Sequence, residues 1–517
     1  MTPLLRFATT ALLALATTTC GSSTSPSVVG RPLLAQTYRP SGHMAAGDVT
    51  VHLFEWRWDD IANECETVLG PAGFHAVQIS PPEEHSITPS HDWSERYQPV
   101  RYNIDHSRSG DSTAFVDMVT RCRTAGVGII VDAVINHMTN VPSPGTGSNG
   151  SPYSKYDYPG LYTQADFHTP CDINSYQSAA EVQDCELLGL PDLNTLLPSV
   201  RTKIAGYLTM LVRLGVEGFR VDAAKHIQQL DLDSIFRIVD STAVADGHPI
   251  PYYYLEVVGN GQGEAIGPHD YYGEAYSSGG AADITEFTFT GVGDKFRQIN
   301  GQKLADLNPS TFPGTWGMMA TDKAVVFLQN HDTQHQCGLS YRDGYVFRLA
   351  NVFMLAQPFG YPSILSSYSF SCPGENSLGP PSDANGWTTN VACVASLESV
   401  SASDQWVCEH RDPYIRNMVA FRHVVAGTTI NHWWDNGANA IAFTRGDQGF
   451  VAINRETTTI TNTVATGMAP GTYCDLLTGG VNGAACVGTT VTVDATGSVQ
   501  LNLASNRAIA IDVANKL

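Results

Sequence analysis

Runs of apolar, β-branched and aromatic residues recur along this chain, with amphipathic stretches between them. Most of the runs are continuously apolar, which is typical of strands buried on both faces of a sheet. Residues Ala114–Arg123 and Val200–Leu214 carry apolar positions at helical spacing and predict amphipathic helices. The runs that predict strands are Val49–Trp56, Ala76–Ser80, Gly128–His137, Gly218–Ala224, Tyr252–Gly259, Ile284–Phe289, Ala324–Asp332 and Pro362–Tyr368.

This alternation predicts an α/β fold, a (β/α)8 TIM barrel. Residues 138–197 interrupt it with a segment rich in Pro, Gly, Ser, Tyr and Asp. A loop of that length usually has its own role, so we expect a small subdomain inserted after strand 3. After about Gly427, short alternating strands with Gly, Asn and Thr turns predict a C-terminal antiparallel β-sandwich. We therefore expect the barrel over 46–137 and 198–427, and the sandwich over 428–517.

The charge balance narrows the possible partners. The 517 residues include 29 Lys and Arg against 50 Asp and Glu, for a net charge of −21. Phosphate binding needs a basic face, so nucleic acid is excluded as a partner. A neutral polymer or a divalent cation fits better.

The first residues are typical of an export signal. One cation, Arg6, precedes the short apolar core Ala11–Ala16, which is too short to span a membrane. We expect residues 1–45 to be a signal peptide and leader, and the mature protein to be secreted, extracellular and free of the membrane. Lipid anchoring at Cys20 is a minor alternative, because the small-residue context around it matches poorly.

Ten cysteines remain when Cys20 is set aside with the leader. An exported chain can oxidise them, and the absence of any C-x-x-C motif in the sequence argues against a metal site. Close spacing suggests Cys171–Cys185 and Cys474–Cys486, although spacing alone does not determine connectivity. The pairs that this choice leaves are Cys65–Cys122, Cys337–Cys372 and Cys393–Cys408.

Three carboxylates come at the ends of predicted strands, namely Asp222, Glu256 and Asp332. In a barrel, these strand ends converge on one cleft. Ionised carboxylates do not gather there for stability, because repulsion and desolvation oppose it. Two acids across a scissile bond are what glycoside hydrolysis requires, one as nucleophile and one as proton donor and then base.

Four regions, in order along the chain, make this pattern specific: Val131–His137, Gly218–Asp222 with Lys225 and His226, Glu256–Val258 and Asn330–Asp332. Together they resemble the signature regions of the α-amylase family, glycoside hydrolase family 13, and the resemblance extends from about Asp48 to the C-terminus. Further motifs lie at Val51–Trp56, Ser80–Pro82, Glu95–Pro99 and Trp406–Arg411. These flanks resemble the animal-type subgroup, which also occurs in bacteria.

The resemblance implies a role for each matching residue. Asp222 would be the nucleophile, Glu256 the general acid/base, and Asp332 the group that stabilises the transition state. Arg220 would hold Asp222 ionised. Residues implied to bind or support the substrate are Trp93, Tyr97, Gln98, Asp132, His137, Arg220, Lys225, His226 and His331. Trp93 and Tyr97 would be stacking platforms for sugar, with packing at the rim of the cleft as the alternative.

A structural Ca²⁺ is expected from oxygen ligands in two domains. Asn136 and Asp192 supply side-chain oxygens, and the resemblance adds the backbone carbonyls of Gln183 and His226. The alternative is that Asn136 caps a turn and Asp192 is a solvated acid. Chloride is expected to be absent. Ser363 occupies the aligned position of the third, basic chloride ligand, although Arg220 and Asn330 match the other two.

The leading hypothesis is a secreted, monomeric, endo-acting enzyme that cleaves α-1,4 bonds of starch or glycogen with retention of configuration. A related exo-acting maltooligosaccharide-forming enzyme or a transglycosylase is the alternative. A non-catalytic sugar-binding relative is a third, which the presence of Asp222, Glu256 and Asp332 opposes. Asn149 begins a glycosylation sequon whose use depends on the host.

Overall fold

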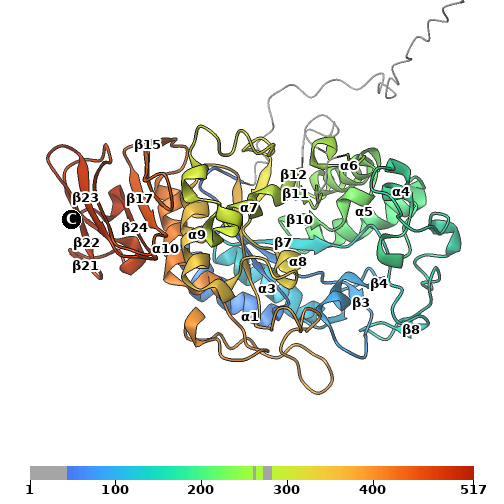
Figure 1. The fold of residues 1–517 in the computed structure, drawn as a ribbon. Coiled ribbons are helices and arrows are strands. Elements are labelled where there is room, and N and C mark those ends of the chain that lie inside the picture. Colours follow the sequence, from blue (N-terminus) through green and yellow to red (C-terminus); the bar gives the residue numbers. More distant parts are fainter. Residues whose placement is uncertain (1–43, 260–262, 272–281) are drawn as a thin grey trace, which may run out of the picture.

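Eight parallel strands close into a barrel at the centre of the molecule (Figure 1). The structure is a computed structural model that describes residues 44–259, 263–271 and 282–517. Around the barrel the strand order is β1-β14-β13-β12-β11-β10-β7-β2. The strands are β1 (Thr50–Leu53), β2 (Ala76–Ile79), β7 (Gly128–Ala133), β10 (Gly218–Val221), β11 (Tyr252–Leu255), β12 (Asp283–Glu286), β13 (Ala324–Val326) and β14 (Tyr361–Ser366). The predicted TIM barrel is confirmed.

Every predicted strand is present, but each ends earlier than its apolar run does. The largest difference is at Asp332, which we expected at the end of a strand. It lies instead in the first turn of helix α8 (His331–His335), well past the end of β13. The Asn330 side chain accepts a hydrogen bond from the Thr333 amide at 2.9 Å. This N-cap starts helix α8. A local polar contact therefore ends the extended segment at a point where the apolar pattern predicts that the strand continues.

Helices surround the barrel. Both predicted helices are present, as α3 and α5, within two residues of the expected bounds. Pairs of neighbouring helices pack side by side, with α5 against α6, α1 against α3 and α9 against α10. The helices are α1 (Trp58–Glu64), α2 (Gly70–Ala72), α3 (Ser112–Thr124), α5 (Pro198–Arg213), α6 (Gln229–Ala245), α7 (Gly291–Arg297), α9 (Tyr345–Ala356) and α10 (Pro413–Val424).

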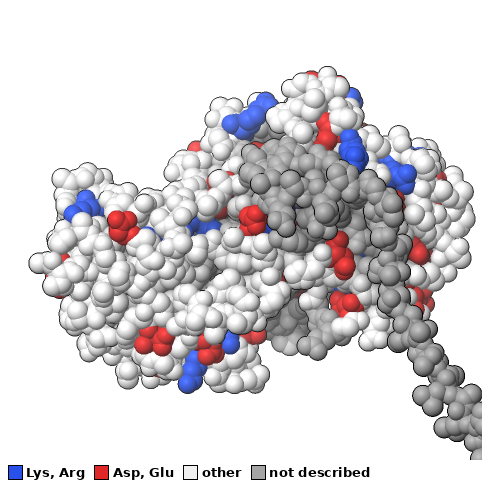
Figure 2. All heavy atoms as spheres, turned by 90° about the horizontal axis from the view of Figure 1, so that it is seen from above, with Lys and Arg blue, Asp and Glu red and all other residues white. Residues whose placement is uncertain are grey.

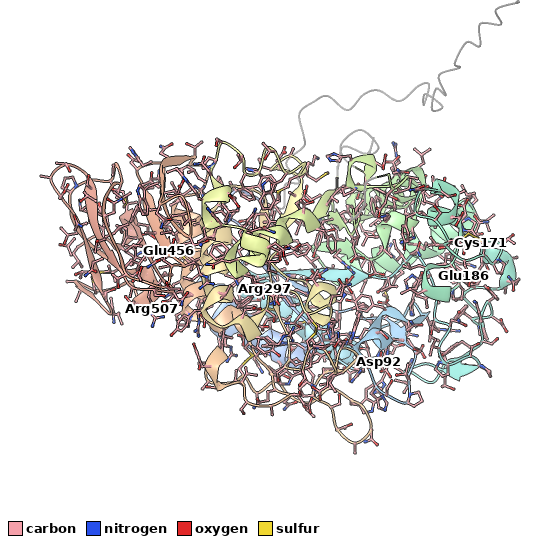
Figure 3. The ribbon with its side chains drawn as sticks, viewed as in Figure 1. Asp92, Cys171, Glu186, Arg297, Glu456 and Arg507 are labelled. Carbon is pink, nitrogen blue, oxygen red and sulfur yellow. A yellow bond between two sulfur atoms is a disulfide. The ribbon has the colours of Figure 1, made fainter. Side chains whose placement is uncertain are left out.

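The segment between β7 and α5 forms the inserted subdomain. It contains the hairpin strands β8 (Gly145–Thr146) and β9 (Pro152–Tyr153) and helix α4 (Ala179–Asp184). In Figure 3, Cys171 and Glu186 mark this end of the molecule and Arg507 marks the opposite end. An antiparallel bridge between His137 and Asp192 joins the start and the end of the insertion.

The C-terminal part consists of two four-stranded antiparallel sheets, as predicted for a sandwich. Strand β23 shows the expected alternation, with every second side chain buried. Its buried side chains pack with those of the facing sheet in a separate hydrophobic cluster. The first sheet is β15 (Ile430–Asp435), β16 (Ala440–Arg445), β17 (Gly449–Asn454) and β24 (Arg507–Asp512); the second is β18 (Ile460–Ala465), β23 (Ser498–Leu503), β22 (Thr490–Val493) and β19 (Gly471–Cys474).

Five disulfides link the ten cysteines of the described part of the chain. Both pairs suggested by spacing are confirmed, as are the three pairs that this choice left. Across the described ranges we find no helix with the length and apolar character that crossing a bilayer requires. On the face drawn in Figure 2, Lys and Arg side chains form separate spots in a larger neutral surface. The expected signal peptide and Cys20 lie outside the described residues.

Candidate active site

The three predicted carboxylates line one cleft at the carboxyl ends of the barrel strands. Asp222 directly follows β10, Glu256 directly follows β11, and Asp332 lies at the start of α8. The cleft has a volume of about 450 Å³. Its lining includes Trp93, Ser94, Tyr97, Gln98, His137, Tyr176, Leu187, Leu188, Leu190, Asp222, Lys225, His226, Glu256, Val258, Glu264, His331 and Asp332. The barrel thus brings together acids that are far apart in the sequence.

Arg220 lies at the centre of the acids. Its Nη1 is 2.6 Å from Asp132 Oδ1 and 2.7 Å from Asp222 Oδ1, and its Nη2 is 2.5 Å from Glu256 Oε1. The register explains this arrangement. Arg220 pairs with Asp132 across β10 and β7, and it shares a face with Asp222 two residues on. On the other side Arg220 pairs with Tyr254 of β11, two residues before Glu256. Side-chain alternation along three neighbouring strands therefore places one guanidinium among three carboxylates.

Burial and mutual repulsion govern the protonation of these acids. Burial raises the pKa of Asp222 well above its usual value, against the attraction of Arg220. The pKa of Asp332 is raised to about 7, first by burial and then by the charge of Glu256. Asp332 and Glu256 are also hydrogen-bonded to each other. Asp332 can therefore hold a proton near neutral pH.

An aromatic group forms one wall of the cleft. Tyr97 stacks on His331, with ring centroids 5.0 Å apart and an interplanar angle of 9°, and its hydroxyl donates to Asp132 Oδ2 at 2.9 Å. Trp93 packs at the edges of Tyr97 and His331 and donates its indole N–H to the Asn376 carbonyl at 3.0 Å. Both rings line the cleft, where an aromatic face can bury the apolar side of a sugar.

Gln98, His137, Lys225 and His226 also line the cleft, whereas Asp132 does not line it and is fully buried beside Arg220. His137 Nε2 is 3.1 Å from the Tyr97 carbonyl oxygen, and Gln98 Oε1 accepts from the Thr139 hydroxyl at 2.9 Å. Lys225 Nζ lies 2.6 Å from Glu264 Oε2 and 2.7 Å from the Val258 carbonyl oxygen. Lys225 is therefore a buried, paired cation in the wall of the cleft.

Sequence reasoning missed several residues of the lining. Tyr176 and Leu188 come from the insertion, and Glu264 comes from the segment after β11. Leu188 is 92% exposed and adopts the left-handed region at φ 54°. No periodicity or motif marks these loop positions. The available signal at Glu264 was a second acid in the segment that follows β11, after Glu256.

The expected metal ligands gather where the insertion meets the barrel, beside the cleft. Leu193 N donates to the Asn136 carbonyl at 3.0 Å, next to the bridge between His137 and Asp192. Asp192 is 3% exposed, and its Oδ1 has no hydrogen-bond partner among the described residues. His226 Nδ1 lies 2.7 Å from the carbonyl oxygen of Val182, the residue before Gln183.

Burial raises the pKa of Asp192 to about 7. The other carboxylate oxygen of Asp192, Oδ2, lies 2.7 Å from His168 Nδ1. Within the described ranges, no group of three His, Cys, Asp or Glu side chains is arranged to hold a metal. The ligands expected for Ca²⁺ are one carboxylate, one side-chain amide and two backbone carbonyls. They therefore do not form a group of that kind.

Arg220, Asn330 and Ser363, the positions aligned with the chloride ligands, line one small cavity. The cavity has a volume of about 30 Å³. Ser363 is 9% exposed and is paired with Thr50 in the register of β14 and β1. The barrel therefore brings the three positions together.

Comparisons with known proteins agree on one family. Residues 73–362 match the alpha amylase catalytic domain, and residues 432–514 match the alpha amylase C-terminal all-beta domain. The alpha-amylase of Tenebrio molitor is 43% identical over 465 residues, covering 88% of this chain and 94% of the relative. Pancreatic alpha-amylase 2a5 of Mus musculus is 40% identical over 495 residues, covering 90% and 94%. Among solved structures, a point mutant of alpha-amylase I of Eisenia fetida in complex with maltohexaose has a TM-score of 0.83 at 36% identity, covering 91% of this chain and 98% of that one.

Proposed function

The chain belongs to the α-amylase family, and on that premise we propose that its cleft hydrolyses internal α-1,4-glucosidic bonds of starch and glycogen. The protein is a glycoside hydrolase with endo-acting α-amylase activity. The observation that carries this conclusion is the meeting of Asp222, Glu256 and Asp332 in one cleft around Arg220. The identity of 40–43% over most of the chain to named α-amylases supports the same substrate class.

The reaction that fits the three acids is a retaining double displacement. The ionised Asp222 carboxylate attacks the anomeric carbon, while Glu256 donates a proton to the leaving glycosidic oxygen as that bond breaks. A glycosyl ester on Asp222 results. Water then attacks the same carbon and gives its proton to Glu256, which restores both acids. Arg220 favours the ionised nucleophile because it lies 2.7 Å from Asp222.

The other residues would hold the sugar. Asp332 would accept hydrogen bonds from hydroxyls of the sugar ring at the cleaved bond. His331 would donate a hydrogen bond to a hydroxyl of the same ring. Asp132 would support the site through its contacts with Arg220 and Tyr97. The remaining residues proposed to bind the substrate are Trp93, Tyr97, Gln98, His137, Lys225 and His226.

We propose a structural calcium ion at the junction of insertion and barrel. Asn136 and Asp192 would supply side-chain oxygens, and Gln183 and His226 backbone carbonyls. The residues fit a hard cation, since Asp192 Oδ1 is a buried carboxylate oxygen without a hydrogen-bond partner among the described residues. When bound, the ion would neutralise Asp192 and clamp the insertion to the barrel. His168 would orient the carboxylate through its other oxygen.

We propose that activity does not depend on chloride. A buried anion needs surplus positive charge. In the small cavity below the cleft, Arg220 already faces three carboxylates, and Ser363 adds no second cation.

Secretion and a monomeric state are further proposals. Five disulfides support export to an oxidising compartment, since such bonds persist there and are rare in the cytosol.

The test is a product profile on soluble starch by wild type and by Asp222→Asn. Wild type should release mixed oligosaccharides early, with a fast fall in iodine staining. The variant should lose at least about a thousandfold in kcat, as nucleophile loss does in enzymes of this kind. Asp494→Asn, an exposed position in the C-terminal sandwich, is the matched control and should retain full activity. Undiminished hydrolysis by Asp222→Asn would refute the mechanism. A single product size from the start would refute endo action.

A further inference from the structure

A small cavity lies below the floor of the cleft, inside the barrel. It has a volume of about 30 Å³, and polar side chains from several strands line it. The residues used in the argument below are His52, Arg220, Gln329, Asn330, His331 and Ser363. His331 belongs to both spaces, since it lines this cavity and the cleft above. The ring thus forms part of the partition between them.

Three residues that line the cavity each carry a buried nitrogen atom without a hydrogen-bond partner among the described residues. These atoms are His52 Nε2, Gln329 Nε2 and His331 Nδ1, and each of the three residues is 3% exposed. A buried polar atom without a partner costs roughly 1–3 kcal/mol. Three such atoms around one small space point to a bound polar molecule that satisfies them together.

Charge excludes an ion from this space. Burial lowers the pKa of His52 to about 3, and burial lowers that of His331 well below its usual value, so both rings are neutral at working pH. Arg220 is engaged by three carboxylates at 2.5–2.7 Å. An anion would therefore find no surplus positive charge, and a cation would face the guanidinium and the amide N–H₂ of Gln329.

Water fits both the size and the chemistry. A water molecule needs roughly 10–15 Å³ of cavity and two to four polar partners, so this space holds about one or two. Water can accept from the Gln329 amide and donate to the unprotonated nitrogen of a neutral imidazole. Neither an anion nor a cation can do both.

We propose that buried water in this cavity fixes the tautomer and orientation of His331 for catalysis. Water donates to Nδ1, so the ring proton resides on Nε2, the nitrogen 3.5 Å from Asp332 Oδ2. That N–H is then directed to Asp332 and the substrate. His52 and Gln329 act through the water and are positioning residues, whereas Ser363 only bounds the space that the water fills. The inference rests on the proposed hydrolysis and identifies what holds its histidine.

The first test is a crystal structure at high resolution, grown with bromide in place of chloride. We expect water density within hydrogen-bond distance of His331 Nδ1 and Gln329 Nε2, and no anomalous signal in the cavity. A bromide peak there, or an empty cavity, would overturn the proposal. This result is independent of whether the protein cleaves starch, so it separates failure of the inference from failure of the proposed function.

The second test compares Ser363→Val, which fills the cavity, with Ser363→Ala, which leaves room for water. The valine variant should lose about tenfold in kcat with KM nearly unchanged, a loss of about 1.4 kcal/mol of transition-state stabilisation. The alanine variant should stay within about twofold of wild type. Equal activity of the two variants would contradict the proposal.

A spectroscopic measurement separates positioning from simple packing. In ¹⁵N-histidine spectra, His331 should show one tautomer in wild type and in Ser363→Ala, and a mixture in Ser363→Val. If the valine variant does not fold, Gln329→Leu, which removes the amide that donates to the water, takes its place with the same expected spectrum. A single unchanged tautomer in the folded variant would overturn the proposal.

Discussion

Replacing Arg220 by methionine keeps most of the side-chain volume but removes the guanidinium that three buried carboxylates share. Arg220 is 4% exposed, Asp132 is 0% exposed, and Asp222 and Glu256 are each 10% exposed at the side chain. Removing one partner of a buried ion pair costs roughly 3–5 kcal/mol, because the other charge stays buried without compensation. We expect a destabilisation of that order at pH 8.

The destabilisation caused by Arg220→Met should become smaller as the pH falls. Burial raises the folded-state pKa of Asp222, and it raises that of Asp332 to about 7, whereas unfolded aspartates titrate near 4. The folded protein therefore binds more protons than the unfolded chain between these values, and it loses stability as the pH rises through the folded pKa. Arg220 opposes these upward shifts. Without it the folded pKa values rise further, so the variant loses more than wild type on going from pH 5 to pH 8.

The assay is thermal unfolding of wild type, Arg220→Met and the control Arg213→Met at both pH values. Arg213 forms an exposed pair with Asp246 at 2.7 Å, with 55% of its side chain exposed. Exposed pairs contribute about 0–1 kcal/mol, so the control should change little at either pH. A deficit of Arg220→Met at pH 5 that equals or exceeds its deficit at pH 8 would refute the reasoning.

Four further outcomes follow from the site. Trp93→Ala should raise KM for starch several-fold with a smaller effect on kcat; a selective loss of kcat would contradict a stacking role. EDTA should lower the unfolding temperature of wild type, but not that of Asp192→Asn, and equal shifts would argue against the calcium site. Added chloride at constant ionic strength should leave the rate unchanged, and a several-fold gain would disprove chloride independence. On the alkaline side, kcat/KM should fall above about pH 7 as Asp332 loses its proton; a flat profile to pH 9 would contradict this assignment.

The apolar runs located every barrel strand because strands buried on both faces need continuous apolar sequence. However, each apolar run extends past the residue at which its strand ends. Strand ends are set by local polar contacts, such as the Asn330 cap of α8, and these lie outside hydrophobic periodicity. The cysteine spacing likewise suggested two disulfides, while the fold shows all five.

The acids of the cleft were predictable because parallel strands place their carboxyl ends together. Tyr176, Leu188 and Glu264 were not, since they come from loops whose path depends on how the insertion packs. The role of Arg220 was visible only in part. The sequence pairs it with Asp222, and the register of β10 with its neighbours β7 and β11 adds Asp132 and Glu256.

The sequence by itself determined the barrel, the sandwich and the residue types that carry the chemistry, because periodicity and motifs are local properties of a chain. Only the tertiary structure decided how three acids share one guanidinium, and which polar atoms enclose the cavity under His331. Those features depend on distances between residues far apart in sequence. Burial then gives these contacts their electrostatic consequences, and burial is a property of the folded state alone.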